Sequence, residues 1–309
     1  MTDDPIDAAL TLHRGGRSGA LATVVRTWGS APRPVGSMMA VTGQGDMVGS
    51  VSGGCVEGAV VAEAAALAEG GGTHRTLTYG VADADAFAVG LACGGTIEIL
   101  LQAVDDDLAG VLDQVQAARG QRRFVAMATD LGTGAAALAD ADAAPDDGTF
   151  VATFPPPLRL AVVGGVHIAQ ALVPMARLAG YAVSVLDPRT AFASPARFPD
   201  TDLIHDWPDE AMAAFAPDAR SAIVTLTHDP KLDDPALAAA LPTQAFYVGA
   251  LGSTRTHAKR VERLRALGVG ADAIARLDAP VGLDIGAKTP AEIAVATLAA
   301  MTRALRMPR

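Results

Sequence analysis

The chain has 309 residues, which is more than one ordinary hydrophobic core accommodates, so its length predicts two domains. Aromatic residues make up only 4% of it, which argues against the stacking surfaces that bind single-stranded nucleic acid. The formal net charge of −10 argues in the same direction, so we expect no nucleic-acid partner.

The first residues, MTDDP, have neither the basic nor the apolar region of a secretory signal. The longest Ala/Val-rich run, residues 59–68, is interrupted by Glu63 and is too short to cross a bilayer. We therefore expect a cytoplasmic protein without membrane contact. Its two cysteines, Cys55 and Cys93, are then expected to be free thiols.

Apolar periodicity, β-branched runs and glycine or proline breaks predict an α+β domain over residues 1–154. Helices are expected at residues 4–17, 56–68 and 106–118. Strands are expected at residues 20–27, 37–41, 48–52, 76–79, 96–103, 123–129 and 149–154, the last two paired around a loop rich in Ala, Asp and Gly. Pro32 and Pro34 fix the backbone on both sides of Arg33, which predicts a stiff loop there.

Three consecutive prolines at residues 155–157 predict an extended linker. After it, apolar strands at residues 159–163, 183–186, 221–226 and 246–250 alternate with helices at residues 167–179, 256–267 and 290–306. Gly180 lies just past the first of these helices and is expected to end it. The alternation predicts that residues 158–309 form a Rossmann-like domain with a doubly wound parallel sheet.

The turn that carries Cys55 is the most informative part of the N-terminal half. Residues 49–58 read GSVSGGCVEG, so Gly53 and Gly54 follow a strand and place Cys55 at the start of an apolar helix. Free backbone N–H groups and the positive end of a helix dipole can hold an anion or favour a thiolate at such a place. Glu57 is interpreted as a cap of that helix in preference to a base.

Cys93 lies in a second glycine-flanked loop, where Gly94 follows it in the sequence LACGG. A pair of thiols beside glycines suits soft metal ligation, sulfur transfer or redox chemistry, and these alternatives stay open. Each cysteine taken alone is also typical of a small buried side chain.

Gly164 and Gly165 follow a strand, and Asp187 comes about 23 residues after the first of them. This spacing resembles the dinucleotide fingerprint, in which backbone N–H groups hold a pyrophosphate and a carboxylate holds a ribose. Val166 stands where a second glycine normally lets the phosphate approach, and its methyl groups obstruct that approach. The pattern therefore predicts the fold and disfavours NAD(P) as a ligand.

Polar residues follow the other strands of this half as well. Ligands of open α/β sheets bind at the carboxyl ends of the strands, so we expect these residues to converge, with Arg255 suited to a phosphate. Taken singly, Asp229 and Ser253 also suit helix capping. The residues expected to converge are Asp187, Arg189, His228, Asp229, Ser253 and Arg255.

The motifs CxxC, HExxH, GxxxxGK[ST] and GxSxG are absent from the sequence, and its six histidines are scattered. These absences disfavour a structural zinc site.

Over nearly its whole length, the sequence resembles the XdhC/CoxI family of xanthine dehydrogenase accessory proteins. The motifs that carry the resemblance are GSAPRPVGSM at residues 29–38, SGGCVE at 52–57, CGG at 93–95, HIAQA at 167–171, DPR at 187–189, THD at 227–229, YVGALGS at 247–253 with Arg255, PVGLDIG at 280–286 and TPAEI at 289–293.

The resemblance implies a chaperone rather than an enzyme. Such proteins bind the molybdenum cofactor (molybdopterin), protect it while its molybdenum gains a terminal sulfur from a cysteine desulfurase, and insert it into a molybdenum hydroxylase such as xanthine dehydrogenase. They are commonly homodimers. The resemblance, together with the patterns above, gives as cofactor-binding candidates Arg33, Ser37, Gly53, Gly54, Cys55, Glu57, Cys93, Gly94, Gly164, His167, Asp187, Arg189, His228, Asp229, Gly252, Ser253 and Arg255, with Cys55 and Cys93 also as metal ligands.

The sequence departs from the family pattern in two places. Residues 164–167 read GGVH where the family usually has Gly-Ala-Gly-His, and Ala92 precedes Cys93 where the family usually has glycine. Three alternative functions remain open: an NAD(P)-dependent oxidoreductase, a sulfur carrier that uses its two thiols, and a binding module without a small-molecule ligand.

Overall fold

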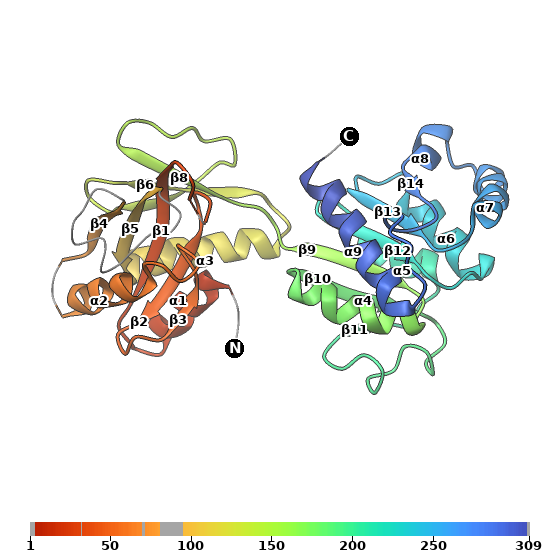
Figure 1. Ribbon diagram of the computed structural model, residues 1–309, viewed down its shortest axis with the longest axis horizontal. Coiled ribbons are helices and arrows are strands. Elements are labelled where there is room, and N and C mark those ends of the chain that lie inside the picture. The colour runs from red at the N-terminus through yellow and green to blue at the C-terminus, as the bar shows by residue number, and fades with distance from the viewer. Residues whose placement is uncertain (1–3, 32, 70–71, 81–94, 308–309) are drawn as a thin grey trace. The chain divides into compact units, whose positions relative to one another are not determined.

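The computed structural model describes residues 4–31, 33–69, 72–80 and 95–307 (Figure 1). The chain divides into two compact units, Met1–Pro156 and Pro157–Arg309, which we call the N-terminal unit and the C-terminal unit and describe separately. Within the described ranges, no helix combines the length and the apolar character needed to cross a membrane.

The N-terminal unit is built on a five-stranded antiparallel sheet in the order β3-β2-β1-β5-β4. The central strand β1 is buried on both sides: Ala22 and Val24 face α2, whereas Leu21 and Val25 belong to the core that contains α1 and α3. The elements are α1 (Pro5–Arg14), β1 (Gly19–Trp28), β2 (Met38–Thr42), β3 (Met47–Gly49), α2 (Glu57–Ala68), β4 (His74–Tyr79), β5 (Thr96–Ala103) and α3 (Asp106–Gly120).

A second sheet, in the order β7-β6-β8, packs against α3 in the same unit. Its strands are β6 (Val125–Asp130), β7 (Ala136–Ala139) and β8 (Thr149–Phe154). The predicted pairing of β6 with β8 is confirmed and antiparallel. The segment that forms the short strand β7 was expected to be loop. Alanine has a low strand propensity, so this segment becomes a strand only through its pairing with β6.

The C-terminal unit is a six-stranded parallel sheet in the order β11-β10-β9-β12-β13-β14, which confirms the predicted doubly wound Rossmann-like fold. Alternate residues of β9 face opposite cores: Leu160 and Val162 pack with α4 and α9, and Ala161 and Val163 pack with α5 and α6. The strands are β9 (Leu158–Val163), β10 (Tyr181–Leu186), β11 (Asp202–Ile204), β12 (Ser221–Thr225), β13 (Tyr247–Ala250) and β14 (Leu277–Asp278).

The helices of this unit cover both faces of the sheet (Figure 1). They are α4 (His167–Leu178), α5 (Pro208–Phe215), α6 (Pro230–Ala240), α7 (Thr254–Ala266), α8 (Ala271–Ala275) and α9 (Pro290–Arg306). Gly180 follows α4 with φ +86°, the conformation that its predicted role as a helix stop requires.

Several elements were not expected from the sequence. Helix α6 contains Pro235, which is typical of a break, yet the helix continues and packs on α5 and β12. Strands β11 and β14 are too short to stand out as periodic patterns. Helix α1 ends at Arg14 instead of residue 17 because Gly15 and Gly16 follow, the latter with φ +65°.

Candidate functional site

The side chain of Glu57 organises the turn before α2, which we call the Glu57 loop (residues 50–57). This carboxylate is 5% exposed and accepts hydrogen bonds from Ser50 Oγ (2.7 Å), Ser52 N (2.9 Å) and Gly54 N (2.8 Å). It also accepts from Val51 N (3.2 Å) and from Ser52 Oγ. One side chain therefore fixes most of the loop backbone.

The expectation of free N–H groups at the Gly53–Gly54 turn is wrong. Gly53 N donates to Ser50 Oγ (2.9 Å), and Gly54 N donates to Glu57. The reason is that the sequence supplies its own anion three residues after Gly54, and that carboxylate occupies the position where an external anion was expected. Gly53 and Gly54 themselves are exposed, with φ of +73° and +109°.

The environment of Glu57 also determines its protonation. Burial would raise the pKa of Glu57, but hydrogen bonds from Ser52 and Ser50 outweigh burial and lower the pKa from 4.5 to about 2. Such an acidic carboxylate stays ionised near neutral pH and is a poor proton acceptor. Glu57 therefore acts as a structural anion of this turn and not as a base. It does not cap α2 as expected, because its carboxylate bonds to residues 50–54 before the helix and the N-cap Val56 has no side-chain cap hydrogen bond.

Cys55 is a free thiol at the edge of this loop. It lies two residues before the first residue of α2, not at the helix start as expected, and Val56 is the N-cap residue. Its partly buried side chain packs on the apolar cluster between α2 and the sheet. The exposed Arg33 lies beside the same loop, where its Nε donates to Ser50 O (3.4 Å).

Two of the candidates, Cys93 and Gly94, lie outside the described residues. The described chain resumes at the buried Gly95, where a Cβ would lie 2.5 Å from Ser30 O and 2.9 Å from Trp28 O. Residue 95 therefore lies against the backbone just before the Arg33 loop. Ser37 accepts a backbone hydrogen bond from Val24 N (2.9 Å) and lines a cavity of about 290 Å³ beside β8.

In the C-terminal unit, Asp187 closes the first Rossmann turn instead of projecting toward a ligand. The fully buried carboxylate accepts from Gly165 N (2.9 Å) and from Arg189 N (3.0 Å), Nε (2.8 Å) and Nη2 (2.7 Å). Burial would raise the pKa of Asp187, but these hydrogen bonds, led by those from Arg189, lower it. The dinucleotide interpretation, with this carboxylate on a ribose, is therefore corrected: Asp187 and Gly165 N–H bind each other.

The glycines of that turn serve close packing. A Cβ on Gly164, which has φ +103°, would lie 2.3 Å from Thr227 Cγ2, and one on Gly165 would lie 2.5 Å from Phe192 O. The Val166 side chain packs against the core. His167 is the exposed first residue of α4. The glycines of this turn thus allow close approach to Thr227 and to the backbone of Phe192. This packing explains the fingerprint-like spacing without a bound pyrophosphate.

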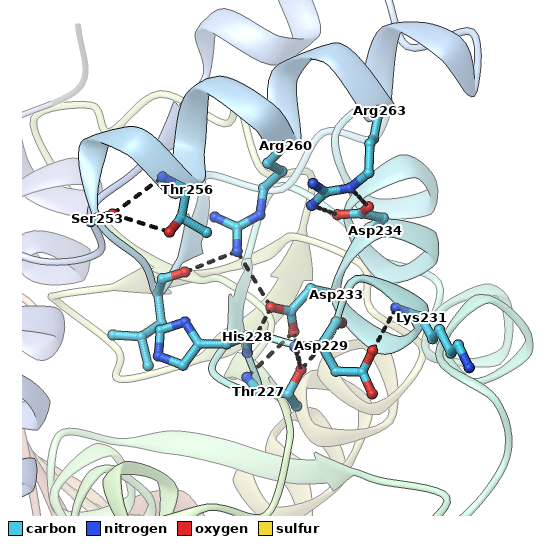
Figure 2. Close-up of polar contacts among 11 residues, drawn as sticks. Thr227, His228, Asp229, Lys231, Asp233, Asp234, Ser253, Thr256, Arg260 and Arg263 are labelled. Atoms are coloured by element: carbon cyan, nitrogen blue, oxygen red, sulfur yellow. Dashed lines mark hydrogen bonds and ion pairs between the residues drawn. The ribbon is translucent and has the colours of Figure 1, made fainter.

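Strands β12 and β13 lead into a pocket between α6 and α7, which we call the α6–α7 pocket (Figure 2). Its volume is about 150 Å³. The titratable residues that line it are His228, Asp233, Arg255, Lys259, Arg260 and Arg263. The predicted convergence is therefore confirmed for His228 and Arg255, which line the pocket. Arg189 does not line it and is held by Asp187, whose hydrogen bond raises the pKa of Arg189, but the charges of Asp229 and Asp233 also raise that pKa, so this pair lies near the pocket.

The capping interpretation is confirmed for two candidates at the starts of α6 and α7. Asp229 is the N-cap of α6 and accepts from Lys231 N (2.9 Å). Ser253 is the N-cap of α7 and accepts from Thr256 N (3.2 Å). Gly252 precedes it with φ +144°, where a Cβ would lie 3.2 Å from atoms of Thr256.

Arg260 is the residue that the sequence reasoning missed. It is 1% exposed, and its Nη2 donates to Leu251 O (2.9 Å) and to Asp233 Oδ2 (3.4 Å). Its Nε and Nη1 have no hydrogen-bond partner in the part of the chain that the structure describes. A buried donor left unpaired typically costs about 1–3 kcal/mol, and more when it is charged.

Asp233 holds the other side of the pocket together. Its carboxylate accepts from Thr227 Oγ1 (2.7 Å) and from His228 N (3.1 Å) (Figure 2). Burial raises the pKa of Asp233, and the bonds from Thr227 and the charge of Arg260 oppose that shift. His228 has φ +64°, a conformation that few non-glycine residues adopt, and its exposed imidazole stands at the mouth.

A sequence signal for the pocket existed. Arg255, Lys259 and Arg263 are spaced by four, so a helix places all three on one face. The buried Arg260 lies next to this face but has no periodic signature of its own. Among the described residues, no group of three or more His, Cys, Asp and Glu side chains is placed to hold a metal ion.

Two family models match the chain. The model described as the XdhC and CoxI family matches residues 12–80, and the model described as the XdhC Rossmann domain matches residues 160–301.

Curated relatives match over nearly the full length. The molybdenum cofactor insertion chaperone PaoD of Escherichia coli (strain K12) is 32% identical over 308 residues, covering 97% of this chain and 88% of that protein. A protein of Bacillus subtilis (strain 168), named as a probable xanthine dehydrogenase subunit, is 27% identical, covering 90% of this chain and 91% of that protein.

A solved structure is also similar. A crystal structure from Bacillus halodurans, described as a xanthine dehydrogenase, has a TM-score of 0.82 and 26% identity, and the match covers 100% of this chain and 97% of that one.

Proposed function

Because the chain belongs to the XdhC and CoxI family, we propose that it is a chaperone of the molybdenum cofactor. In this proposal it holds the cofactor while molybdenum gains its terminal sulfur and then inserts it into a molybdenum hydroxylase of the xanthine dehydrogenase type. The names of the relatives from E. coli and B. subtilis support the cofactor and the kind of partner. A cysteine desulfurase as sulfur donor, a homodimer and a cytoplasmic location complete the proposal.

The observation that carries the proposal is the position of Cys55 on the Glu57 loop. The cargo is an anion with a dithiolene-bound molybdenum at one end and a phosphate at the other. A thiol is a soft ligand and suits the metal end. Arg33 contacts the same loop at Ser50 O and supplies a positive charge there.

The same loop does not fit the phosphate end. The N–H groups of Gly53 and Gly54 are already bonded, and the ionised Glu57 beside them repels a second anion. Rigid attachment of the loop instead keeps the thiol in one place, because the carboxylate fixes Gly54 before it and Val56 N after it donates to Ser52 Oγ (2.8 Å). We therefore assign Cys55 and Arg33 to the metal end of the cargo.

The test is the molybdenum and pterin content of the full chain, purified after co-expression with an active cofactor pathway. We expect near-stoichiometric cofactor in the wild type and its loss in Cys55→Ala and Cys55→Ser. The matched control is Met47→Ala, which removes an exposed sulfur on β3 of the same unit and should retain cofactor. The Cys55→Ala change should lower the free energy of unfolding by no more than about 1–2 kcal/mol, the ordinary range for a point change.

Three outcomes would count against this proposal. Equal cofactor in Cys55→Ala and wild type would remove Cys55 from the site, and a globally unfolded variant would show that the thiol is a packing residue. Absence of cofactor from the wild type, together with a persulfide on Cys55 after treatment with a desulfurase, would favour a sulfur carrier instead.

A further inference from the structure

The α6–α7 pocket concentrates positive charge in a chain whose net charge is −10. Arg263 is paired with Asp234, with Nη2 3.1 Å from Oδ1, and Arg260 is paired with Asp233. Within the described ranges, Arg255 and Lys259 form no ion pair with any residue. Their charges therefore face the pocket without an internal counter-ion.

The arrangement of these charges on α7 is unfavourable for the helix by itself. Arg255, Lys259 and Arg263 follow one another at intervals of four residues, and like charges at this spacing destabilise a helix. An anion bound between Arg255 and Lys259 would convert this repulsion into attraction.

Arg260 supplies an independent indication of a ligand. It is buried, it lines the pocket, and its Nε and Nη1 have no partner in the described part of the chain. Figure 2 shows its guanidinium between α7 and Asp233, with Thr256 on one side and the Arg263–Asp234 pair on the other. Nε and Nη1 each carry an N–H donor that can bond to a phosphate oxygen.

The size of the pocket limits what enters it. Its volume of about 150 Å³ lies below the roughly 300–1,000 Å³ of sites that enclose a whole drug-sized ligand. It is therefore suited to one anionic group, while the rest of the ligand extends past the exposed His228 at the mouth. Asp233 also lines this space, but the paired Arg260 offsets its charge, and Thr227 and the His228 N–H engage its carboxylate.

From this geometry we propose that the α6–α7 pocket binds a phosphate group, with Arg260 at its base and Arg255 and Lys259 at its rim. The group belongs either to the pterin cargo, a source that rests on the proposed function, or to a free phosphorylated metabolite. The first Rossmann turn does not line this pocket, and its Gly165 N–H is bonded to Asp187.

The experiment measures pyrophosphate and inorganic phosphate binding to the full chain, purified without cofactor, by isothermal titration calorimetry at low ionic strength. We expect saturable binding that weakens with added salt and becomes about tenfold weaker or more in Arg255→Ala and in Lys259→Ala, since each removes a charged donor. Arg265→Ala is the matched control, because it removes an exposed arginine of the same helix that does not line the pocket, and its affinity should equal that of the wild type.

Because Arg260 is buried, binding to Arg260→Lys is measured together with its circular dichroism spectrum. If the variant is folded, we expect affinity to fall as in the rim variants. The proposal is overturned if the wild type does not bind either probe, or if the two rim variants bind as tightly as Arg265→Ala.

The source of the phosphate is decided by a second measurement on the same variants, the pterin content after co-expression with the cofactor pathway. Loss of pterin in Arg255→Ala and Lys259→Ala, but not in Arg265→Ala, assigns the pocket to the cargo. Unchanged pterin together with weakened pyrophosphate binding assigns it to a free metabolite. Because the calorimetry uses no cofactor, failure of the chaperone role and failure of the phosphate site give different results.

Discussion

Glu57 links the stability of the N-terminal unit to pH. Its pKa is depressed in the folded chain to about 2, against 4.5 for an ordinary glutamate. The ionised carboxylate therefore stabilises the fold fully above about pH 5, and this contribution is lost as the pH falls from about 5 toward 2. A shift of this size corresponds to about 3 kcal/mol.

We predict that Glu57→Gln lowers the free energy of unfolding by about 3 kcal/mol at pH 7, and that the difference from the wild type shrinks as the pH approaches 2. The measurement is urea denaturation at pH 7 and at pH 3. Glu262→Gln, an exposed glutamate on α7, is the control and should change little. A difference between Glu57→Gln and the wild type that stays constant with pH would contradict the assigned pKa.

Individual residues show where sequence reasoning stopped. The caps Asp229 and Ser253 were interpreted correctly because an N-cap bonds to N–H groups two or three residues away. Asp187 was misassigned because its partner, Gly165 N–H, lies 22 residues away in the sequence. Arg260 was missed because the partners of its Nη2, Leu251 O and Asp233, lie 9 and 27 residues away, and only the fold brings them to it.

Among the elements of the C-terminal unit, the two glycines on either side of α4 separate the effect of packing from that of backbone strain. Gly164 and Gly180 both have positive φ, but a Cβ on Gly164 meets Thr227 Cγ2 at 2.3 Å, whereas nothing lies within 4 Å of one on Gly180. We predict that Gly180→Ala costs about 1–2 kcal/mol from strain alone, and that Gly164→Ala costs at least about 1–3 kcal/mol more.

Denaturant unfolding of the two variants side by side measures this difference. Equal destabilisation would mean that the turn can move away from Thr227.

Elements with a strong local pattern were predicted closely. Residues 96–103 and 290–306 are the strand Thr96–Ala103 and the helix Pro290–Arg306, each with the expected bounds. The helix has a capping box at Thr289 and Glu292, which marks its start in the sequence. Helix α6 and strand β7 were missed because Pro235 and a run of alanines favour other structures locally, and tertiary packing decides their conformation.

At the scale of the whole molecule, each unit has its own cores and its own sheets. We predict that residues 158–309 fold alone, with a cooperative thermal transition and the helical circular dichroism signal of α4 to α9. The control is the full chain, in which the same transition should be visible. A fragment that melts without cooperativity would show that the C-terminal unit needs the N-terminal one, and that the linker assignment at residues 155–157 does not mark an independent domain.

The backbone of the Glu57 loop has a consequence for amide hydrogen exchange. The N–H groups of Val51, Ser52 and Gly54 all donate to the Glu57 carboxylate. They can exchange with solvent only when these hydrogen bonds break. A surface loop bordered by exposed glycines should then exchange slowly and as a block. The deuterium uptake of a proteolytic peptide that spans residues 50–57 would therefore report the state of the whole loop. Faster uptake would show that acid or a mutation has loosened the loop around Cys55, and slower uptake would show that a bound cargo has stabilised it.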